Sequence, residues 1–166
     1  MVAPKLRLIS PLQLAENQEK LTGSVPVRAL VRLRDAVCSD QGKVNYELRF
    51  GKDEQGGVII LGEFNVNLRV RCQRCMQPMD LPLEHKIGLA VANPQDARNI
   101  PERYEPLVLV EHQVALETLL EEEILLALPI APVHEQGNCN GRDLVDKYKP
   151  AINSPFAVLK NLKTEK

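Results

Sequence analysis

The sequence predicts an α+β fold, in which a twisted antiparallel β-meander is covered by one long helix, with a short N-terminal helix and a basic C-terminal tail. Three observations predict it. Apolar and polar residues alternate along segments between residues 44 and 91, an apolar stripe at helical spacing occupies residues 113–128, and prolines and glycines separate these segments. We expect residues 1–139 to form a single α+β domain containing a Cys-x-x-Cys turn, and residues 140–166 to form a basic, partly flexible tail.

The N-terminal segment predicts one helix and one strand. Ser10-Pro11-Leu12-Gln13 has the residue types of a capping box with proline at the first helical position, which predicts a helix from there to about Leu21. Gly23 then supplies the residue that often ends a helix. Residues 25–37 fit both periodicities, and the alternation of their apolar residues favours a strand.

The central segment predicts the meander. Residues 44–50 alternate, residues 51–57 form a glycine-containing turn, and residues 58–61 resume as an apolar strand that we expect Gly62 to break or bulge. Alternation over residues 64–71 then leads directly into Cys72, and it continues over residues 81–91.

The C-terminal half predicts a connection, a short strand and a helix. Residues 93–106 contain three prolines without periodicity, residues 107–110 read as a strand, and residues 113–128 carry an apolar helical stripe. Pro129 and Pro132 prevent the helix from continuing and favour an extended exit.

Composition excludes several classes of protein. Apolar residues make up 44% of the chain and charged residues 26%, which is close to the globular average and excludes disordered, collagen-like and disulfide-dense proteins. No apolar run approaches the roughly 18 residues that span a membrane, and the first residues lack a secretory signal. We therefore expect a cytoplasmic protein with no membrane partner.

The net charge of −1 conceals a partition along the chain. Residues 1–75 carry +4, residues 76–139 carry −8 and residues 140–166 carry +3. Such blocks can form one face for phosphate and another for a basic partner. Alternatively, folding mixes them into ordinary solvated surfaces.

Cys72-Gln73-Arg74-Cys75 carries the clearest chemical signal. Two cysteines separated by two residues in a tight turn can direct both sulfurs at one tetrahedral ion, and half of a zinc site is a common use of such a pair. His134 and Cys139, with a glycine between them, provide a second pair. The candidate ligands are therefore Cys72, Cys75, His134 and Cys139, and zinc is the candidate cofactor.

Two alternatives remain open for these cysteines. Reduced thiols in a turn need no ligand, and short cysteine motifs often bind none. A thioredoxin-like centre needs its first cysteine at a helix N-terminus, where the thiol pKa is lowered, but Met76–Pro82 contains two prolines and predicts no long helix. A Cys72 pKa at or above about 8.5 removes the nucleophile that such an enzyme needs.

No motif predicts catalysis. The sequence lacks a glycine-rich phosphate loop, a nucleophile elbow and a paired-carboxylate motif, so we expect no enzyme and no small-molecule substrate. We interpret Glu121, Glu122 and Glu123, which fall within the predicted helix, as part of a solvated face. We interpret three isolated residues as structural: Cys38, His85 and His112.

Three arginines adjoin the cysteine turn. Arg69, Arg71 and Arg74 are candidate RNA-binding residues, because guanidinium groups suit phosphate. With only 4% aromatic residues in the chain, such a patch would hold the backbone of structured RNA rather than read bases. The alternative is an ordinary charged outer strand.

Three segments together resemble the YceD family of bacterial proteins, which are named for accumulation of large-subunit ribosomal RNA. They are Arg71–Cys75 with Pro78 following, Glu122–His134, and Ser154–Lys163. Pro101–Pro106 is also in keeping, whereas residues 1–68 resemble the family only in layout.

The resemblance implies a non-enzymatic factor for synthesis, processing or stability of large-subunit ribosomal RNA during ribosome biogenesis. It implies a ribosomal RNA precursor or pre-ribosomal particle as partner, and the acidic helix suits a basic ribosomal protein. Two alternatives are a zinc-stabilised adaptor that binds only protein and a Cys-x-x-Cys thiol oxidoreductase. Ser154–Lys163 intersperses apolar residues with lysines, which suits an amphipathic helix that docks on a partner or on its own domain.

Overall fold

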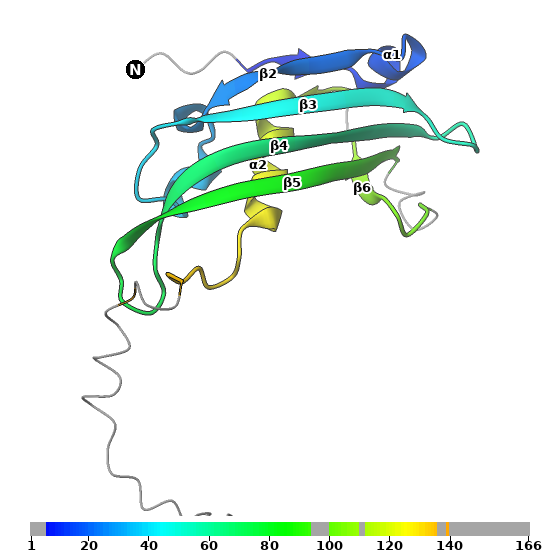
Figure 1. Cartoon of the computed structure of the whole chain (residues 1–166). Helices are drawn as coiled ribbons and strands as arrows, with labels where there is room; N and C mark the ends of the chain where they lie inside the picture. Colours follow the sequence, from blue (N-terminus) through cyan, green and yellow to red (C-terminus); the bar gives the residue numbers. More distant parts are fainter. Residues whose placement is uncertain (1–5, 94–99, 110–111, 136–138, 140–166) are drawn as a thin grey trace, which may run out of the picture.

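The computed structural model describes residues 6–93, 100–109, 112–135 and 139. They form an α+β fold with one five-stranded sheet, one two-stranded sheet and few helices (Figure 1). The tail predicted at residues 140–166 lies outside the described residues, and the division of the chain at residue 139 stays a prediction. The elements are β1 (Leu8–Ile9), α1 (Pro11–Glu16), β2 (Lys20–Pro26), the 3-10 helices η1 (Val27–Ala29) and η2 (Arg32–Asp35), β3 (Lys43–Lys52), β4 (Val58–Arg71), β5 (Pro78–Ala92), β6 (Glu105–Val108), β7 (Val114–Ala115) and α2 (Leu116–Ala127).

The five-stranded sheet has the order β2-β3-β4-β5-β6. Its first four strands are antiparallel neighbours, which confirms the predicted meander through β3, β4 and β5. β6 pairs parallel to β5, however, so the sheet is mixed rather than purely antiparallel. Periodicity could not show this, because it reports which face of a strand is buried and not the direction in which its neighbour runs.

The N-terminal predictions require two corrections. α1 ends at Glu16 rather than Leu21, and Ser10 makes no side-chain capping hydrogen bond. Leu21 and Gly23 lie in β2, where seven residues pair with β3. A Cβ atom at Gly23 would come within 2.8 Å of the Tyr46 hydroxyl, so glycine there serves close packing rather than a helix end.

Residues 27–35 form two 3-10 helices instead of the predicted strand. Val27, Leu30 and Leu33 are fully buried, and their spacing of three residues matches the period of a 3-10 helix. The strand prediction was wrong because a strand would place Val31 on the same buried face as Val27 and Leu33, whereas Val31 is exposed.

Gly62 does not interrupt β4, which runs unbroken in register with both neighbours. Any Cβ atom at this position would collide with the carbonyl oxygen of Glu47 on β3. The glycine therefore permits close approach of two backbones rather than a break.

α2 crosses one face of the sheet, as Figure 1 shows, and closes the apolar core. Its stripe of Leu116, Leu119, Leu120 and Ile124 is fully buried, as predicted. The helix begins at Leu116 rather than at residue 113, because Val114–Ala115 pair with β1. Among the described residues, no helix is long and apolar enough to span a membrane.

The glutamates of α2 do not all face solvent, which corrects the prediction of a solvated face. Glu121 and Glu123 are buried, and only Glu122 is exposed, where it pairs with Arg32 at 3.0 Å. The Glu121 carboxylate accepts the backbone N–H groups of Arg32 at 2.6 Å and Leu33 at 3.1 Å. It thus satisfies donors at the start of η2 that the short helix cannot satisfy itself.

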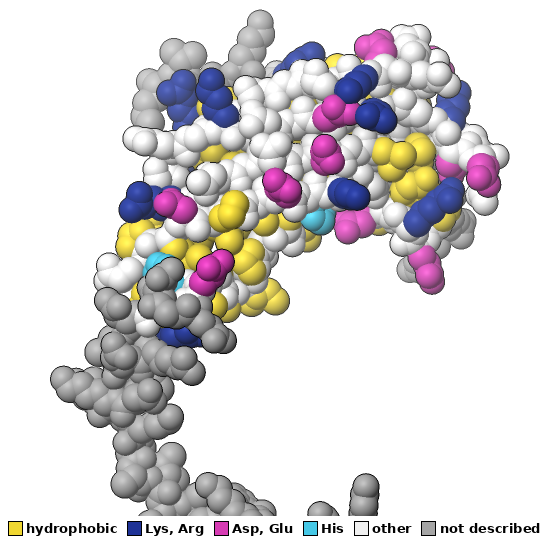
Figure 2. All heavy atoms as spheres, in the orientation of Figure 1, with side chains coloured by type: hydrophobic (Ala, Val, Ile, Leu, Met, Phe, Trp, Pro, Cys, Tyr) yellow, Lys and Arg dark blue, Asp and Glu magenta, His cyan; other side chains and the backbone are white. Residues whose placement is uncertain are grey.

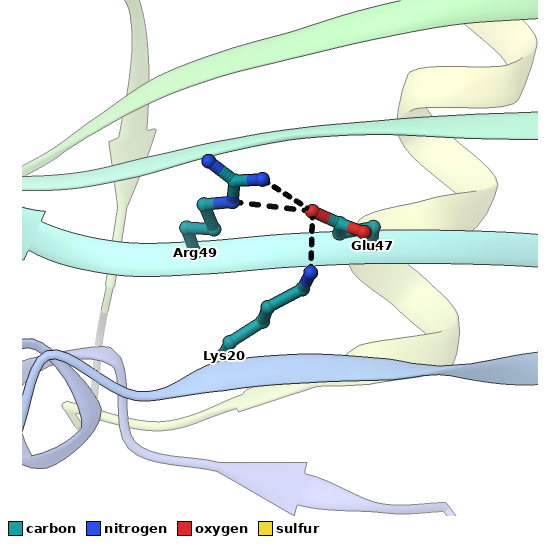
Figure 3. Close-up of polar contacts among 3 residues, drawn as sticks. All are labelled: Lys20, Glu47 and Arg49. Atoms are coloured by element: carbon teal, nitrogen blue, oxygen red, sulfur yellow. Dashed lines mark hydrogen bonds and ion pairs between the residues drawn. The ribbon is translucent and has the colours of Figure 1, made fainter.

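The sheet face opposite α2 is polar and carries charges of both signs (Figure 2). On it, one Glu47 oxygen accepts Lys20 Nζ and Arg49 Nη2, each at 2.8 Å (Figure 3). Hydrogen bonds from Lys20 and Arg49 lower the pKa of Glu47. Because exposed pairs are screened by water, this cluster contributes little stability, and it leaves the face without a uniform sign of charge.

Candidate metal centre at the end of the sheet

The turn between β4 and β5 holds the first two candidate ligands. The Cys72 N–H donates to the Gln77 carbonyl and the Met76 N–H donates to the Cys72 carbonyl, both at 2.9 Å. Met76 adopts a left-handed φ of 61°, which residues other than glycine rarely adopt. These constraints fold the chain back tightly, so that Cys72 and Cys75 direct their sulfurs to one side.

The segment after α2 supplies the other two. α2 stops at Ala127, Leu128 has an extended backbone, and the Gln73 N–H donates to the Pro132 carbonyl at 2.8 Å. Figure 1 shows this segment reaching the β4–β5 turn. The structure therefore brings together His134, Cys139 and the cysteine turn, although 58 residues separate Cys75 from His134.

The four ligand atoms lie within 4.8 Å of one another. Cys72 Sγ and Cys139 Sγ are 3.8 Å apart, and Cys75 Sγ and His134 Nδ1 are 3.4 Å apart. A tetrahedral zinc ion with bonds of about 2.3 Å to sulfur and about 2.0 Å to nitrogen spaces its ligands by roughly 3.5–3.8 Å. The spacing of these pairs thus suits such an ion, and all four cysteines of the chain are free thiols.

The environment of the site shifts the pKa values of Cys72 and Cys75 in opposite directions. Burial raises the pKa of Cys72, but hydrogen bonds from the N–H groups of Cys75, His134 and Arg74 outweigh it and lower the pKa to about 5. A hydrogen bond from the Gln77 N–H lowers the pKa of Cys75, but burial and the neighbouring thiols of Cys72 and Cys139 outweigh it. The pKa of Cys75 is therefore raised. The pKa of Cys72 therefore lies below that of Cys75.

Redox chemistry would need more than a thiolate. The low pKa of Cys72 meets the electronic requirement, but its side chain is 0% exposed and residues 72–77 form a turn instead of a helix N-terminus. An attacking thiolate must reach the sulfur of a substrate disulfide, and Cys72 offers it no access.

The three candidate arginines are exposed around this centre. Arg69 and Arg71 project from the polar face of β4, and Arg74 lies in the turn, where its N–H donates to Cys72 Sγ at 3.4 Å. Arg69 stands opposite Asp80 in the sheet, and its carbonyl accepts the Cys38 N–H at 2.6 Å. None of the ion pairs found among the described residues involves these arginines.

The remaining isolated residues stay outside the cluster. Cys38 is exposed and lines a groove of about 350 Å³ with Arg71, Gln73 and the prolines after α2. His85 packs against Phe64 with ring centroids 5.8 Å apart, and His112 adopts a left-handed φ of 58°.

Sequence reasoning missed the backbone groups that assemble the centre. The Pro132 carbonyl and the left-handed Met76 carry no signal in residue type, since a carbonyl belongs to every residue and methionine does not predict a positive φ. The proline pair after α2 was the only visible hint that the chain turns towards the cysteines.

Comparisons with known proteins place the chain in a family. Residues 60–163 match the family model described as large ribosomal RNA subunit accumulation protein YceD. A Haemophilus influenzae protein of the same description is 31% identical over 163 residues, which cover 93% of this chain and 94% of the relative. No solved structure matches. The chain therefore belongs to the YceD family of large ribosomal RNA subunit accumulation proteins.

Proposed function

We propose that this protein is a non-enzymatic cytoplasmic factor that supports the synthesis, processing or stability of large-subunit ribosomal RNA during ribosome biogenesis. The observation that carries the proposal is the likeness over nearly the whole chain to a relative named for accumulation of this RNA. The family description names an RNA outcome and no reaction, which is in keeping with a scaffold.

The candidate metal centre would make the end of the sheet at the β4–β5 turn rigid. We propose that zinc is held by Cys72, Cys75, His134 and Cys139, which supply three sulfurs and one imidazole nitrogen in a closed set. A closed set of four protein ligands leaves no position for substrate, so the ion would serve structure. It would fix the β4–β5 turn against the segment that follows α2.

Exposed charged residues of the protein suit two kinds of contact. Arg69, Arg71 and Arg74 are exposed and would hold phosphates of a ribosomal RNA precursor or pre-ribosomal particle. The exposed acidic Glu122 of α2 would face a basic ribosomal protein.

The test measures RNA in cells that lack the gene. We expect the ratio of large- to small-subunit ribosomal RNA to fall and to recover when the full chain is supplied. Affinity capture of the full chain should recover large-subunit RNA precursors. An unchanged ratio in the deletion, together with capture free of ribosomal RNA, would refute the function.

A zinc-stabilised adaptor that binds only protein is the second candidate, favoured by the same cluster of ligands. It predicts no affinity for RNA, whereas phosphate contacts predict binding that weakens steeply with salt. Titration of the purified protein with precursor RNA at two salt concentrations separates the two. A thiol oxidoreductase is disfavoured by the burial of Cys72.

A further inference from the structure

One half of β5 has an apolar face that the described elements leave partly exposed. The face turned towards the core comprises alternate residues, and the half nearer β6 is buried at Ile87 and Leu89. The half nearer the metal centre is only partly buried, at Met79, Leu81 and Leu83. β6 does not flank this half, since it pairs only with Leu89–Ala92.

This partly exposed half borders a groove of about 530 Å³. Met79, Leu81 and Val133 contribute apolar walls, and Asp80 and Glu135 place carboxylates at its rim. Figure 2 shows hydrophobic side chains gathered below β5 beside histidine. Val133 is 40% exposed, and residues 133–135 form the opposite wall.

The chemistry of the groove selects its occupant. An apolar channel with an acidic rim suits a segment that intersperses apolar anchors with lysines. Ser154–Lys163 is such a segment, with apolar Phe156, Leu159 and Leu162 and basic Lys160 and Lys163, in a tail that carries +3.

The position of the tail favours the same occupant. Residue 140 follows Cys139, which is buried at the metal centre beside the groove. Fourteen residues connect Cys139 to Ser154, and an extended chain of that length reaches about 45 Å. Tethering at this point gives the segment an effective concentration in the millimolar range, which a separate partner would have to exceed.

We propose that Ser154–Lys163 docks into the groove between the first half of β5 and residues 133–135 of its own chain. Phe156 and Leu159 then cover Met79 and Leu81, and the lysines approach Asp80 and Glu135. The inference is independent of the proposed function, because it requires no RNA.

The experiment places a photo-crosslinking benzoylphenylalanine at Phe156 of the full-length protein as purified. Benzoylphenylalanine retains an aromatic ring at position 156, and mass spectrometry identifies the peptide to which it crosslinks. We expect labelling within one chain of a peptide that contains Met79–Leu83 or Val133–Glu135. The same reagent at Asn161, a polar residue of the segment, should label these peptides at least five-fold less.

A variant of the groove supplies the reciprocal test. Val133→Asp places a charge in the apolar wall and should reduce labelling several-fold. Val108→Asp is the matched control, because Val108 is 42% exposed and lies on β6 at the other end of β5, and it should leave labelling unchanged. Thermal melting verifies that both variants fold.

Three results would overturn the docking. They are labelling confined to other surfaces of the chain, labelling only between two copies, and labelling no stronger from residue 156 than from residue 161. The second result would assign the groove to a second molecule of the protein.

Discussion

The backbone N–H of Gln73 donates to the carbonyl of Pro132 at 2.8 Å, which joins the cysteine turn to the segment after α2. Gln73 lies between the two cysteines of the turn, and Pro132 lies two residues before His134. This single contact therefore sets both halves of the candidate metal centre in register. It does so with backbone atoms alone, so substitution of either side chain would leave it in place.

Loss of one ligand should remove the metal. We expect the purified protein to carry about one zinc ion, and Cys75→Ser to lose it together with several kcal/mol of stability. Cys38→Ser is the matched control, because Cys38 is exposed and outside the cluster, and it should retain both. Elemental analysis and thermal melting with and without chelator measure the effect. A native protein that is metal-free and equally stable in chelator contradicts the site.

Charge reversal beside the turn should weaken RNA association. Arg71→Glu combined with Arg74→Glu replaces two exposed guanidiniums and should reduce co-sedimentation with pre-ribosomal particles by about ten-fold or more, since several phosphate contacts act together. Lys52→Glu with Lys86→Glu makes the same change in charge at exposed sites distant from the turn. Equal co-sedimentation of the two double variants would remove the arginines from the interface.

Glu123 should make stability fall as pH rises. Burial of its carboxyl, with smaller contributions from Glu105 and Glu122, raises the pKa to about 7 from 4.5. The folded protein thus binds this proton more tightly than the unfolded chain does, and stability declines between pH 4.5 and 7. Glu123→Gln should raise the melting temperature by a few degrees above pH 7 and leave it unchanged below pH 4.5.

The control for that titration is Glu54→Gln in the exposed turn between β3 and β4. It removes one carboxylate without relieving burial, and its melting temperature should follow the wild-type dependence on pH. A Glu123→Gln profile parallel to the wild-type profile over the whole range would show that the carboxyl does not titrate in this window.

Gly62→Ala should destabilise the sheet. Its Cβ atom would collide with the Glu47 carbonyl, which belongs to the paired backbone of β3 and cannot rotate away. The cost should be about 1–3 kcal/mol or more, as for other overpacked positions. Gly51→Ala is the matched control, because a Cβ atom at this position of β3 would meet no other atom within 4 Å. Denaturant unfolding compares the two, and equal stabilities would disprove the close approach.

Local pattern was sufficient where one face of an element is buried along its whole length. The alternation of β3 and β4 and the apolar stripe of α2 each repeat over several residues, so burial itself dictates the element. The residue types of the candidate ligands were likewise visible, because a thiol or an imidazole is chemically distinctive wherever it lies.

Local pattern failed where a distant strand or a buried polar group decided the outcome. Lys20–Pro26 is a strand because β3 pairs with it, and Leu21 alone could equally end a helix. Glu121 is buried because η2 offers two N–H donors to it, which helical spacing cannot reveal.

The sequence by itself determined the α+β class, the strands of the meander and the identity of the four candidate metal ligands, since these depend on periodicity and chemistry that neighbouring residues share. Only the tertiary structure decided the parallel pairing of β6, the burial of Glu121 and Glu123, and the meeting of Cys72 and Cys75 with His134 and Cys139. Each of these depends on contacts between residues distant in the chain, whose free energy exists only once the sheet has closed against α2.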